Sequence, residues 1–153
     1  MAPLPPGERR TYTSNDGARL TFSYTRGAPG VSAAAGAPLV VLLHGALRRR
    51  HERRRTRRLT RFCRRCAGWS GSRRYWDTVV PRLAARGLSV LAPDLRWHGD
   101  SAAGSPPGGC SHVARLGTDL VELLCGASGA CPEAVVANPL VLVGASMGAA
   151  VAW

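Results

Sequence analysis

The sequence predicts an α/β fold in which an N-terminal β-hairpin precedes a parallel sheet of β-α-β-α-β connectivity. Three short apolar runs typical of buried strands, at 38–43, 88–92 and 140–143, alternate with segments of helical periodicity. Ahead of them, a turn sequence at 15–17 separates two stretches with the alternation of paired strands. A length of 153 residues allows one modest domain built from these elements.

The N-terminal region divides after residue 10. Residues 1–10 are rich in proline and are expected to form a disordered terminus, whereas 11–26 form the hairpin. The rest of the chain, 11–153, is predicted to be one partial domain that an insertion at 48–69 interrupts. A Gly/Ala-rich loop leads from the hairpin to the first parallel strand.

Two helices are predicted between the parallel strands. From 75 to 86, apolar residues recur at the spacing of an amphipathic helix, with Pro81 either bending it or marking a later start. Gly87 is the expected C-cap of this helix. A second helix is predicted from His112 to Cys125, after a Gly/Pro-rich loop.

The segment 48–69 differs in composition from everything around it. The chain carries 21 Lys+Arg, all of them arginine, against 9 Asp+Glu. Eleven of these arginines lie between Arg48 and Arg65, next to a single acid, Glu52. The net charge of +12 is therefore concentrated in one run, and the remainder is close to neutral.

The favoured interpretation of 48–69 is a disordered insertion that loops out of the fold. Such a segment cannot bury a core of its own, and its high charge favours an unfolded chain. Joining Leu47 directly to Ser70 also leaves a compact strand-to-helix loop.

Two other interpretations of this segment remain open. The arginines at 48–65 have the charge expected of a basic, non-catalytic module that binds nucleic acid non-specifically. Cys63 and Cys66 have the spacing of half a zinc site, although no second pair follows at a suitable distance.

The most informative stretch joins the strand at 140–143 to a run of small residues that favours a helix. Here Gly144, Ser146 and Gly148 form the pattern G-x-S-x-G. A serine on a tight strand-to-helix turn is held in strained backbone, with its hydroxyl directed away from the sheet. Side chains two residues to either side would collide with the neighbouring strand and helix, which explains both glycines. The pattern predicts that Ser146 is a nucleophile.

A second stretch supplies a partner for this serine. The strand at 38–43 runs into His44 and Gly45, and the next amide, that of Ala46, is predicted to face the amide of Met147. Two amides placed in this way form an oxyanion hole. His44 is expected to fix the loop through hydrogen bonds and not to act as the base, because a base follows the serine in this chain order.

The loop at 93–101 carries Asp94, Arg96 and His98 after the next strand. These residue types could form an active site by themselves. We expect them instead to form a hydrogen-bonded scaffold beside the cleft.

These motifs together resemble those of the α/β-hydrolase superfamily. The resemblance rests on three sequences in order and spacing: His44-Gly45, the D-x-R-x-H-G-D-S run that starts at Asp94, and Gly144-Ala-Ser-Met-Gly148. It covers 11–47 and 70–153. The chain looks most similar to single-domain, serine esterase-like members that carry the second motif after the fourth strand.

The resemblance implies a reaction and a topology. Ser146 would attack a carboxylic ester, thioester or amide of a small acyl substrate and form an acyl-enzyme, with no cofactor or metal. The hairpin would lie at one edge of the sheet, and the chain would be the N-terminal part of the fold, ending at the nucleophile elbow.

The catalytic triad is incomplete in this sequence. In the family the acid and the histidine follow the serine, whereas all 4 histidines precede Ser146 and no acid follows it. The chain as given is therefore expected to be a fragment with little or no hydrolase activity. Its elbow strand is expected to form an uncovered sheet edge.

Composition also indicates the cellular environment. Five cysteines at irregular spacing, without a secretory signal, favour reduced thiols in the cytoplasm or another intracellular compartment. No apolar run reaches the length of a membrane span.

Overall fold

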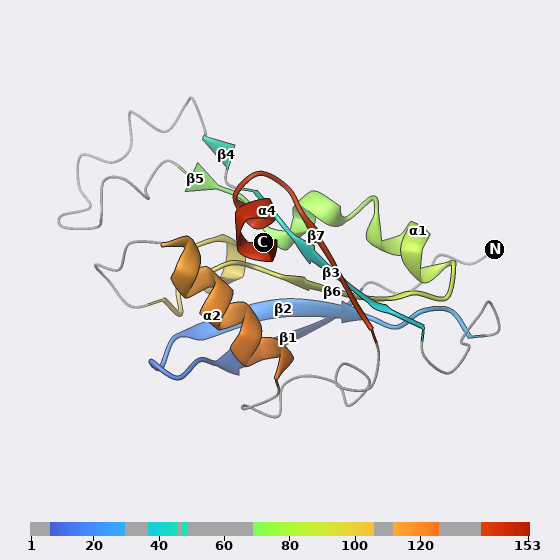
Figure 1. Ribbon diagram of the computed structural model, residues 1–153, viewed down its shortest axis with the longest axis horizontal. Helices are drawn as coiled ribbons and strands as arrows, with labels where there is room; N and C mark the ends of the chain where they lie inside the picture. Colours follow the sequence, from blue (N-terminus) through green and yellow to red (C-terminus); the bar gives the residue numbers. More distant parts are fainter. Residues whose placement is uncertain (1–6, 30–36, 46, 49–68, 106–111, 126–138) are drawn as a thin grey trace.

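A five-stranded mixed sheet forms the centre of the computed structural model, which describes residues 7–29, 37–45, 47–48, 69–105, 112–125 and 139–153 (Figure 1). Its strands are β1 (Glu8–Thr13), β2 (Arg19–Thr25), β3 (Leu39–Leu43), β6 (Ser89–Pro93) and β7 (Leu140–Gly144). The order across the sheet is β1-β2-β6-β3-β7. The hairpin β1-β2 joins β6 antiparallel, and β3 lies parallel to both β6 and β7. The predicted α/β class is confirmed, with the hairpin at one edge and the elbow strand at the other.

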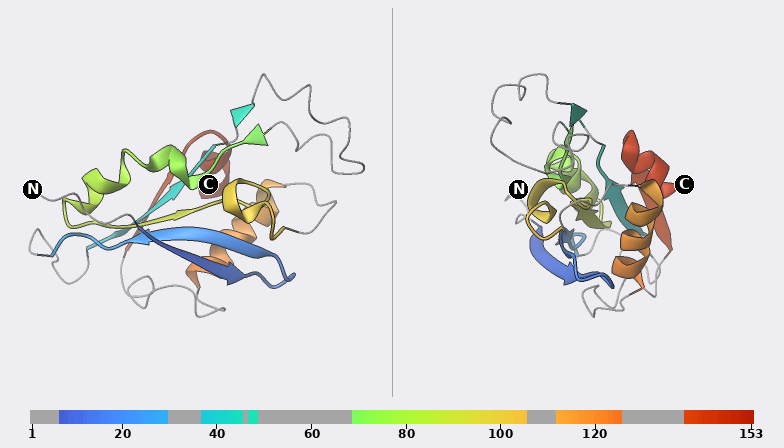
Figure 2. Two further views of the ribbon diagram at one scale, coloured as in Figure 1. Left: turned by 180° about the vertical axis from the view of Figure 1, so that it is seen from behind. Right: turned by 90° about the vertical axis from the view of Figure 1, so that its left-hand side faces the viewer.

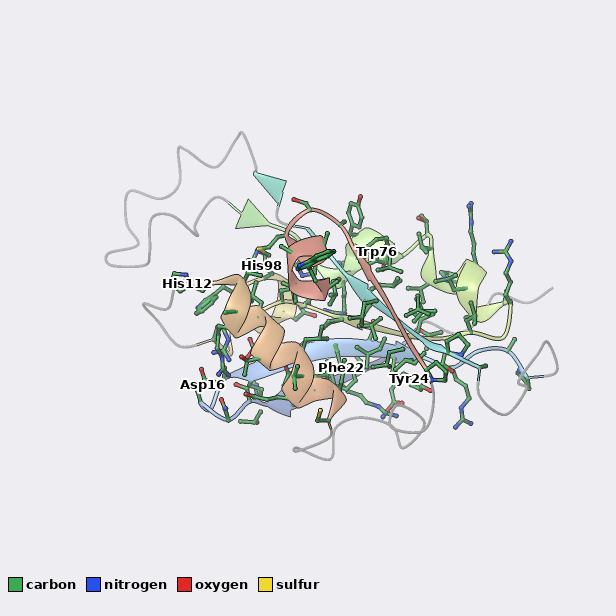
Figure 3. All side chains as sticks on the ribbon, in the orientation of Figure 1. Asp16, Phe22, Tyr24, Trp76, His98 and His112 are labelled. Carbon is green, nitrogen blue, oxygen red and sulfur yellow. The ribbon has the colours of Figure 1, made fainter. Side chains whose placement is uncertain are left out.

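Helices cover both faces of this sheet (Figure 2). One face carries α2 (Val113–Leu124) and α4 (Met147–Ala152), and the other carries the 3₁₀ helix η3 (Arg73–Trp76) and α1 (Val80–Ala84). Alternate residues of β3 enter the two cores: Leu39, Val41 and Leu43 on the α2 side, and Val40 and Leu42 on the α1 side. In Figure 3, Phe22 marks the first core and Trp76 marks the second. The continuous apolar run of β3 follows from burial on both faces.

The hairpin begins earlier than the sequence predicted. β1 starts at Glu8, opposite Tyr24 of β2, and the Arg10 guanidinium carbon lies 5.7 Å from the centre of the Tyr24 ring. Residues 8–10 are thus part of a strand, and their assignment to a disordered terminus is wrong. The cause is pairing across the hairpin, which a short polar stretch does not reveal by itself. The turn is as predicted, with Gly17 at a φ of 82°.

The helix predicted at 75–86 is divided into two short ones. η3 ends at Trp76, and α1 begins only at Val80. Pro81 lies in the first turn of α1, where a backbone N–H has no intrahelical partner, so the later start is the one realised. Gly87 follows with a φ of 82°, and the second predicted helix appears as α2 within a residue of each expected end.

The edge strand β7 is more exposed than its apolar sequence suggested. Leu140, Val141, Leu142 and Val143 each leave between 38% and 43% of their surface exposed. Burial on both faces, as predicted for this strand, is therefore wrong for the described residues. Within the described sheet β7 has β3 as its one neighbour, which confirms the expected uncovered edge.

The two ends of the basic segment lie side by side. β4 (Leu47–Arg48) pairs antiparallel with β5 (Trp69–Ser70), which places Leu47 opposite Ser70. Arg48 and Trp69, the predicted limits of the insertion, thus belong to a short ribbon. Residues 49–68, with Cys63, Cys66 and most of the clustered arginines, lie outside the described residues.

One buried arginine joins three segments of the fold. Arg96, in the loop after β6, donates from Nε and Nη2 to the Asp119 carboxylate of α2 at 2.8 and 2.6 Å. It also donates to Asp16 and to the Ser14 hydroxyl in the hairpin turn. The bonds to Asp119 raise the pKa of Arg96 above its already high usual value. Hairpin, loop and α2 are therefore fixed to one another through one guanidinium.

We expect Arg96→Met to lower the free energy of unfolding by about 3 kcal/mol, the low end of the cost of breaking a buried ion pair, because the buried Asp119 carboxylate then keeps only the more exposed Arg115 as an ionic partner. The measurement is chemical denaturation followed by circular dichroism. Arg82→Met, at an exposed position of α1, is the matched control and should change stability by less than about 0.5 kcal/mol. A similar small loss for both variants would contradict this role of Arg96.

Replacing residues 49–68 with Asn-Gly should leave the denaturation midpoint of the chain unchanged. Arg48 and Trp69 are already cross-strand partners, so a two-residue turn can close the ribbon without moving its strands. Circular dichroism and denaturation of the shortened and complete chains test this. A shortened chain that loses cooperative unfolding would show that the removed residues support the fold.

Candidate active site

Ser146 occupies a sharp turn between β7 and α4. Its φ is 52° and its ψ is −114°, and it is the N-cap residue of α4. Among the described residues, Ser146 and Trp97 are the two non-glycine residues with positive φ. Such backbone costs on the order of 1–3 kcal/mol and persists where the surroundings enforce it. The turn predicted from the G-x-S-x-G pattern therefore has the strained geometry that the pattern requires.

The two flanking glycines allow this turn to form. A Cβ at Gly144 would collide with the carbonyl oxygen of Gly148, and a Cβ at Gly148 would collide with that of Leu43. The turn is also tied to β3, because the Ala145 amide donates to the Leu43 carbonyl at 3.0 Å. The chain thus passes too close to β3 and to its own next turn for any side chain at 144 or 148.

The predicted oxyanion donors are only partly described. Met147 is the first residue of α4, directly after Ser146, as the prediction requires. Ala46 lies outside the described residues, so its role as the second donor stays a prediction. Its neighbour Gly45 lies against the elbow, since a Cβ there would be 2.9 Å from the Ala145 oxygen and 3.1 Å from the Ser146 Cβ.

His44 is buried at the end of β3 and is fully engaged in hydrogen bonds. Its Nδ1 lies 2.9 Å from the Gly45 carbonyl oxygen, and its Nε2 accepts a hydrogen bond from the Leu95 amide at 3.0 Å. Burial, the largest effect, lowers the pKa of His44 below its ordinary value. The ring therefore joins the loop after β3 to the loop after β6, which agrees with the structural role expected for it.

The loop after β6 is a scaffold of buried polar groups. The Asp94 carboxylate accepts from the Arg73 amide at 2.6 Å, from the Arg73 guanidinium, and from the Asp100 amide at 2.9 Å. The Ser101 hydroxyl, in the 3₁₀ helix η4 (Gly99–Ser101), donates to the Asp94 carbonyl and accepts from the Thr21 amide of β2. Asp94 thus holds η3 and η4 together beside the elbow.

Arg73 is the residue of this region that sequence reasoning missed. It lies 21 positions before Asp94, and no local motif links the two. Its second guanidinium nitrogen also bonds Asp100 at 2.8 Å, which lowers the pKa of Asp100. A pair so distant in sequence is found only when the fold brings its members together.

The described histidines lie in other settings than a hydrogen bond to Ser146. Of the three described histidines, His44 and His98 are buried within the scaffold, and His112 is exposed at the N-cap of α2. No described side chain forms a hydrogen bond with the Ser146 hydroxyl. The described part of the chain likewise contains no group of three or more His, Cys, Asp or Glu side chains placed to hold a metal ion.

No helix in the described ranges is long and apolar enough to cross a membrane. Cys125, at the end of α2, is a free, exposed thiol. The other four cysteines lie outside the described residues.

Two helical glycines offer a matched test of the elbow geometry. Gly148→Ala should destabilise the fold, because the new Cβ meets the Leu43 carbonyl, whereas Gly117→Ala meets nothing within 4 Å. At Gly117 the alanine should stabilise α2 by about 0.5–1 kcal/mol, the usual helix preference over glycine. Denaturation of both variants measures the difference. Equal stabilisation at both positions would contradict the close contact at Gly148.

A family model described as Alpha/beta hydrolase family matches residues 40–153. Among solved structures, an α/β hydrolase from Novosphingobium aromaticivorans superposes with a TM-score of 0.61 at 23% identity, over 99% of this chain and 39% of that one. An esterase from Pyrococcus furiosus gives 0.60 at 21% identity, with coverages of 97% and 45%. Epoxide hydrolase A from Mycobacterium thermoresistibile gives 0.58 at 25% identity, with 97% and 34%. The chain therefore spans less than half the length of each of these three.

A search among curated proteins finds no significant match. The structural likenesses below 25% identity establish a shared fold and nothing beyond it. The family match covers well over half of the chain and includes most of β3 and the Ser146 turn. The chain belongs to the alpha/beta hydrolase family and comprises a part of that fold.

Proposed function

We propose that this chain carries the nucleophile and its supporting loops for a serine hydrolase that cleaves carboxylic esters, or the related thioesters and amides. The observation that carries the proposal is the backbone of Ser146, with φ at 52° in a turn whose flanking glycines admit no side chain. Strained backbone conformations cluster at functional sites, so the observed conformation of Ser146 supports a functional role for its hydroxyl. The family match and the esterase among the similar structures support it.

The reaction follows from the chemistry of serine. Ser146 Oγ would attack the acyl carbonyl, its proton passing to a base, and the carbonyl oxygen would become an oxyanion. The Met147 amide, with Ala46 as the proposed second donor, would stabilise that charge. Collapse would release the alcohol as the base passes the proton on to the leaving oxygen, and would leave an acyl-enzyme ester, which water then hydrolyses to the carboxylic acid and the free serine.

The serine also favours acyl substrates over epoxides, although one similar structure is an epoxide hydrolase. A serine oxygen that opened an epoxide would become an ether. Water does not cleave an ether under these conditions, so the enzyme would be consumed. Water can cleave an acyl-serine ester by attack on its carbonyl carbon, so the free serine is regenerated and turnover continues.

The two described histidines nearest the elbow do not supply the base. The Nδ1 of each faces a backbone carbonyl, the Nε2 of His44 is occupied by the Leu95 amide, and the Nε2 of His98 is buried and makes no hydrogen bond to Ser146. We therefore propose that an acid and a histidine outside the described residues complete the triad. The nucleic-acid interpretation concerns 48–65 and gains no support from the described structure or the comparisons.

The 153-residue chain should hydrolyse short p-nitrophenyl esters no faster than its Ser146→Ala variant, and should react poorly with a fluorophosphonate probe. Without a base the hydroxyl stays protonated and is a weak nucleophile, and loss of a triad partner typically costs several powers of ten in rate. The measurement is initial rate together with mass-spectrometric mapping of the labelled residue.

A longer chain that supplies an acid and a histidine after Ser146 should be labelled at Ser146, and Thr78→Ala, which removes an exposed hydroxyl between η3 and α1, is the control that retains labelling. Labelling at any other residue, or none in the longer chain, would overturn Ser146 as the nucleophile. Ser146-dependent turnover by the 153-residue chain itself would instead show that the base comes from within these residues.

A further inference from the structure

His44 contacts both loops that meet beside the Ser146 turn. Its Nδ1 donates to the Gly45 carbonyl at 2.9 Å, because a carbonyl oxygen only accepts. Its Nε2 must then accept from the Leu95 amide at 3.0 Å, because a backbone amide only donates. The bonding pattern requires a neutral ring with its proton on Nδ1. A proton on Nε2 would place two N–H groups against each other.

The peptide that His44 holds is in direct contact with the elbow. Gly45 lies so close to Ala145 and Ser146 that a Cβ on it would be 2.9 Å from the first and 3.1 Å from the second. Gly71 closes the other side, since a Cβ there would collide with the Gly45 carbonyl. A movement of the Gly45 peptide therefore changes the surroundings of Ser146 at once.

A second buried histidine lies against the first. The ring centres of His44 and His98 are 5.3 Å apart, and His98 is 5% exposed. The Nδ1 of His98 donates to the Arg96 carbonyl at 2.8 Å, while its Nε2 is buried without a hydrogen-bond partner. Protonation of that nitrogen would bury an unpaired cation beside a second imidazole, which is costly.

The charge of Asp94 favours protonation of both rings, but it does so less than burial opposes it. Asp94 is the acid that faces both rings, but its carboxylate already accepts from Arg73 and from the Asp100 amide. The Arg96 guanidinium is directed to Asp119, and β7 and α4 contain no charged residue. Burial is the largest effect on both rings and lowers the pKa of each.

We propose that His44 and His98 act as a coupled pair of positioning residues, which hold Gly45 against the elbow only while both rings are neutral. The Ser146 turn is then acid-sensitive, although neither histidine takes part in the chemistry. This inference goes beyond the hydrolase function and depends on the geometry of the turn, so it holds or fails without any measurement of catalysis.

The sign of the effect follows from proton linkage. A freed histidine has a pKa of about 6.5, above that of the buried ring, so opening the pair takes up protons. Above about pH 6.5 the closed turn is insensitive to pH. Below it, the open population should rise about tenfold per pH unit for each histidine, until the pKa of the closed state is reached.

The first test is the tautomer of each ring, observed by ¹⁵N NMR of imidazole-labelled protein at pH 7.5. Both rings should be neutral with the proton on Nδ1. A cationic ring, or a proton on Nε2, at either His44 or His98 would overturn the proposal. This test needs no variant that might alter the fold.

The second test is amide hydrogen exchange between pH 6.5 and 5.5, corrected for the intrinsic rate. In the native chain, exchange at Leu95 and at 143–148 should accelerate about tenfold or more over this unit, while the hairpin and α2 stay protected. His44→Gln keeps an acceptor for the Leu95 amide, and His98→Asn keeps a donor for the Arg96 carbonyl. Neither replacement can be protonated.

The double variant should lose this pH dependence, and His98→Asn alone should reduce its slope. His112→Asn removes an exposed histidine at the start of α2 and is the matched control that leaves the dependence unchanged. If the pH dependence of exchange survives in the double variant, or disappears in His112→Asn, the proposal that His44 and His98 act as a pair is overturned. Equal acceleration in α2 would do the same, because it would mean that the whole fold opens.

Discussion

A buried guanidinium is stable only where acceptors satisfy its N–H groups. Arg96 meets this condition because it pairs with two acids that are distant in the sequence. Asp119 comes from α2 and Asp16 from the hairpin turn. The loop after β6, which carries Arg96, therefore cannot shift without exposing or unpairing charge. Because the same loop carries Leu95 and His98, this constraint also fixes the groups that surround the elbow.

The loop after β6 connects to each neighbouring segment through a different residue. Asp94 holds Arg73 on the α1 face, Arg96 holds the α2 face, and Ser101 bonds the Thr21 amide of β2. Each bond is buried or nearly so and links segments far apart in sequence. In this chain, Asp94 and Arg96 are residue types common in active sites, but they form the scaffold beside the Ser146 turn.

The elbow is supported unevenly. On the β3 side it is tied by the Ala145 amide to Leu43 and by the close contacts of Gly45 and Gly148. On the far side, the four apolar residues of β7 are more than a third exposed. Strain at Ser146 is stored where packing is tight, so the support that matters most for the turn comes from β3 and from the His44 loop.

The sequence by itself determined the fold class, the ends of most strands, the strained turn at Ser146 and the need for its two glycines. These features are local, because apolar runs, turn residues and a five-residue motif each consist of consecutive residues. The predictions from sequence were wrong for residues 8–10, for the single helix around Pro81, and for the burial of β7. Each of those depends on a neighbour, or the lack of one, that is distant in the chain.

Only the tertiary structure decided which polar residues form the scaffold. The pairs Arg73–Asp94 and Arg96–Asp119, and the contact of His44 with His98, join residues 21, 23 and 54 positions apart, and no periodicity encodes such contacts. Whether a histidine is a base or a positioning group is set by the partners of its two nitrogens. Those partners are backbone atoms of other segments, and a sequence does not show where backbone atoms lie.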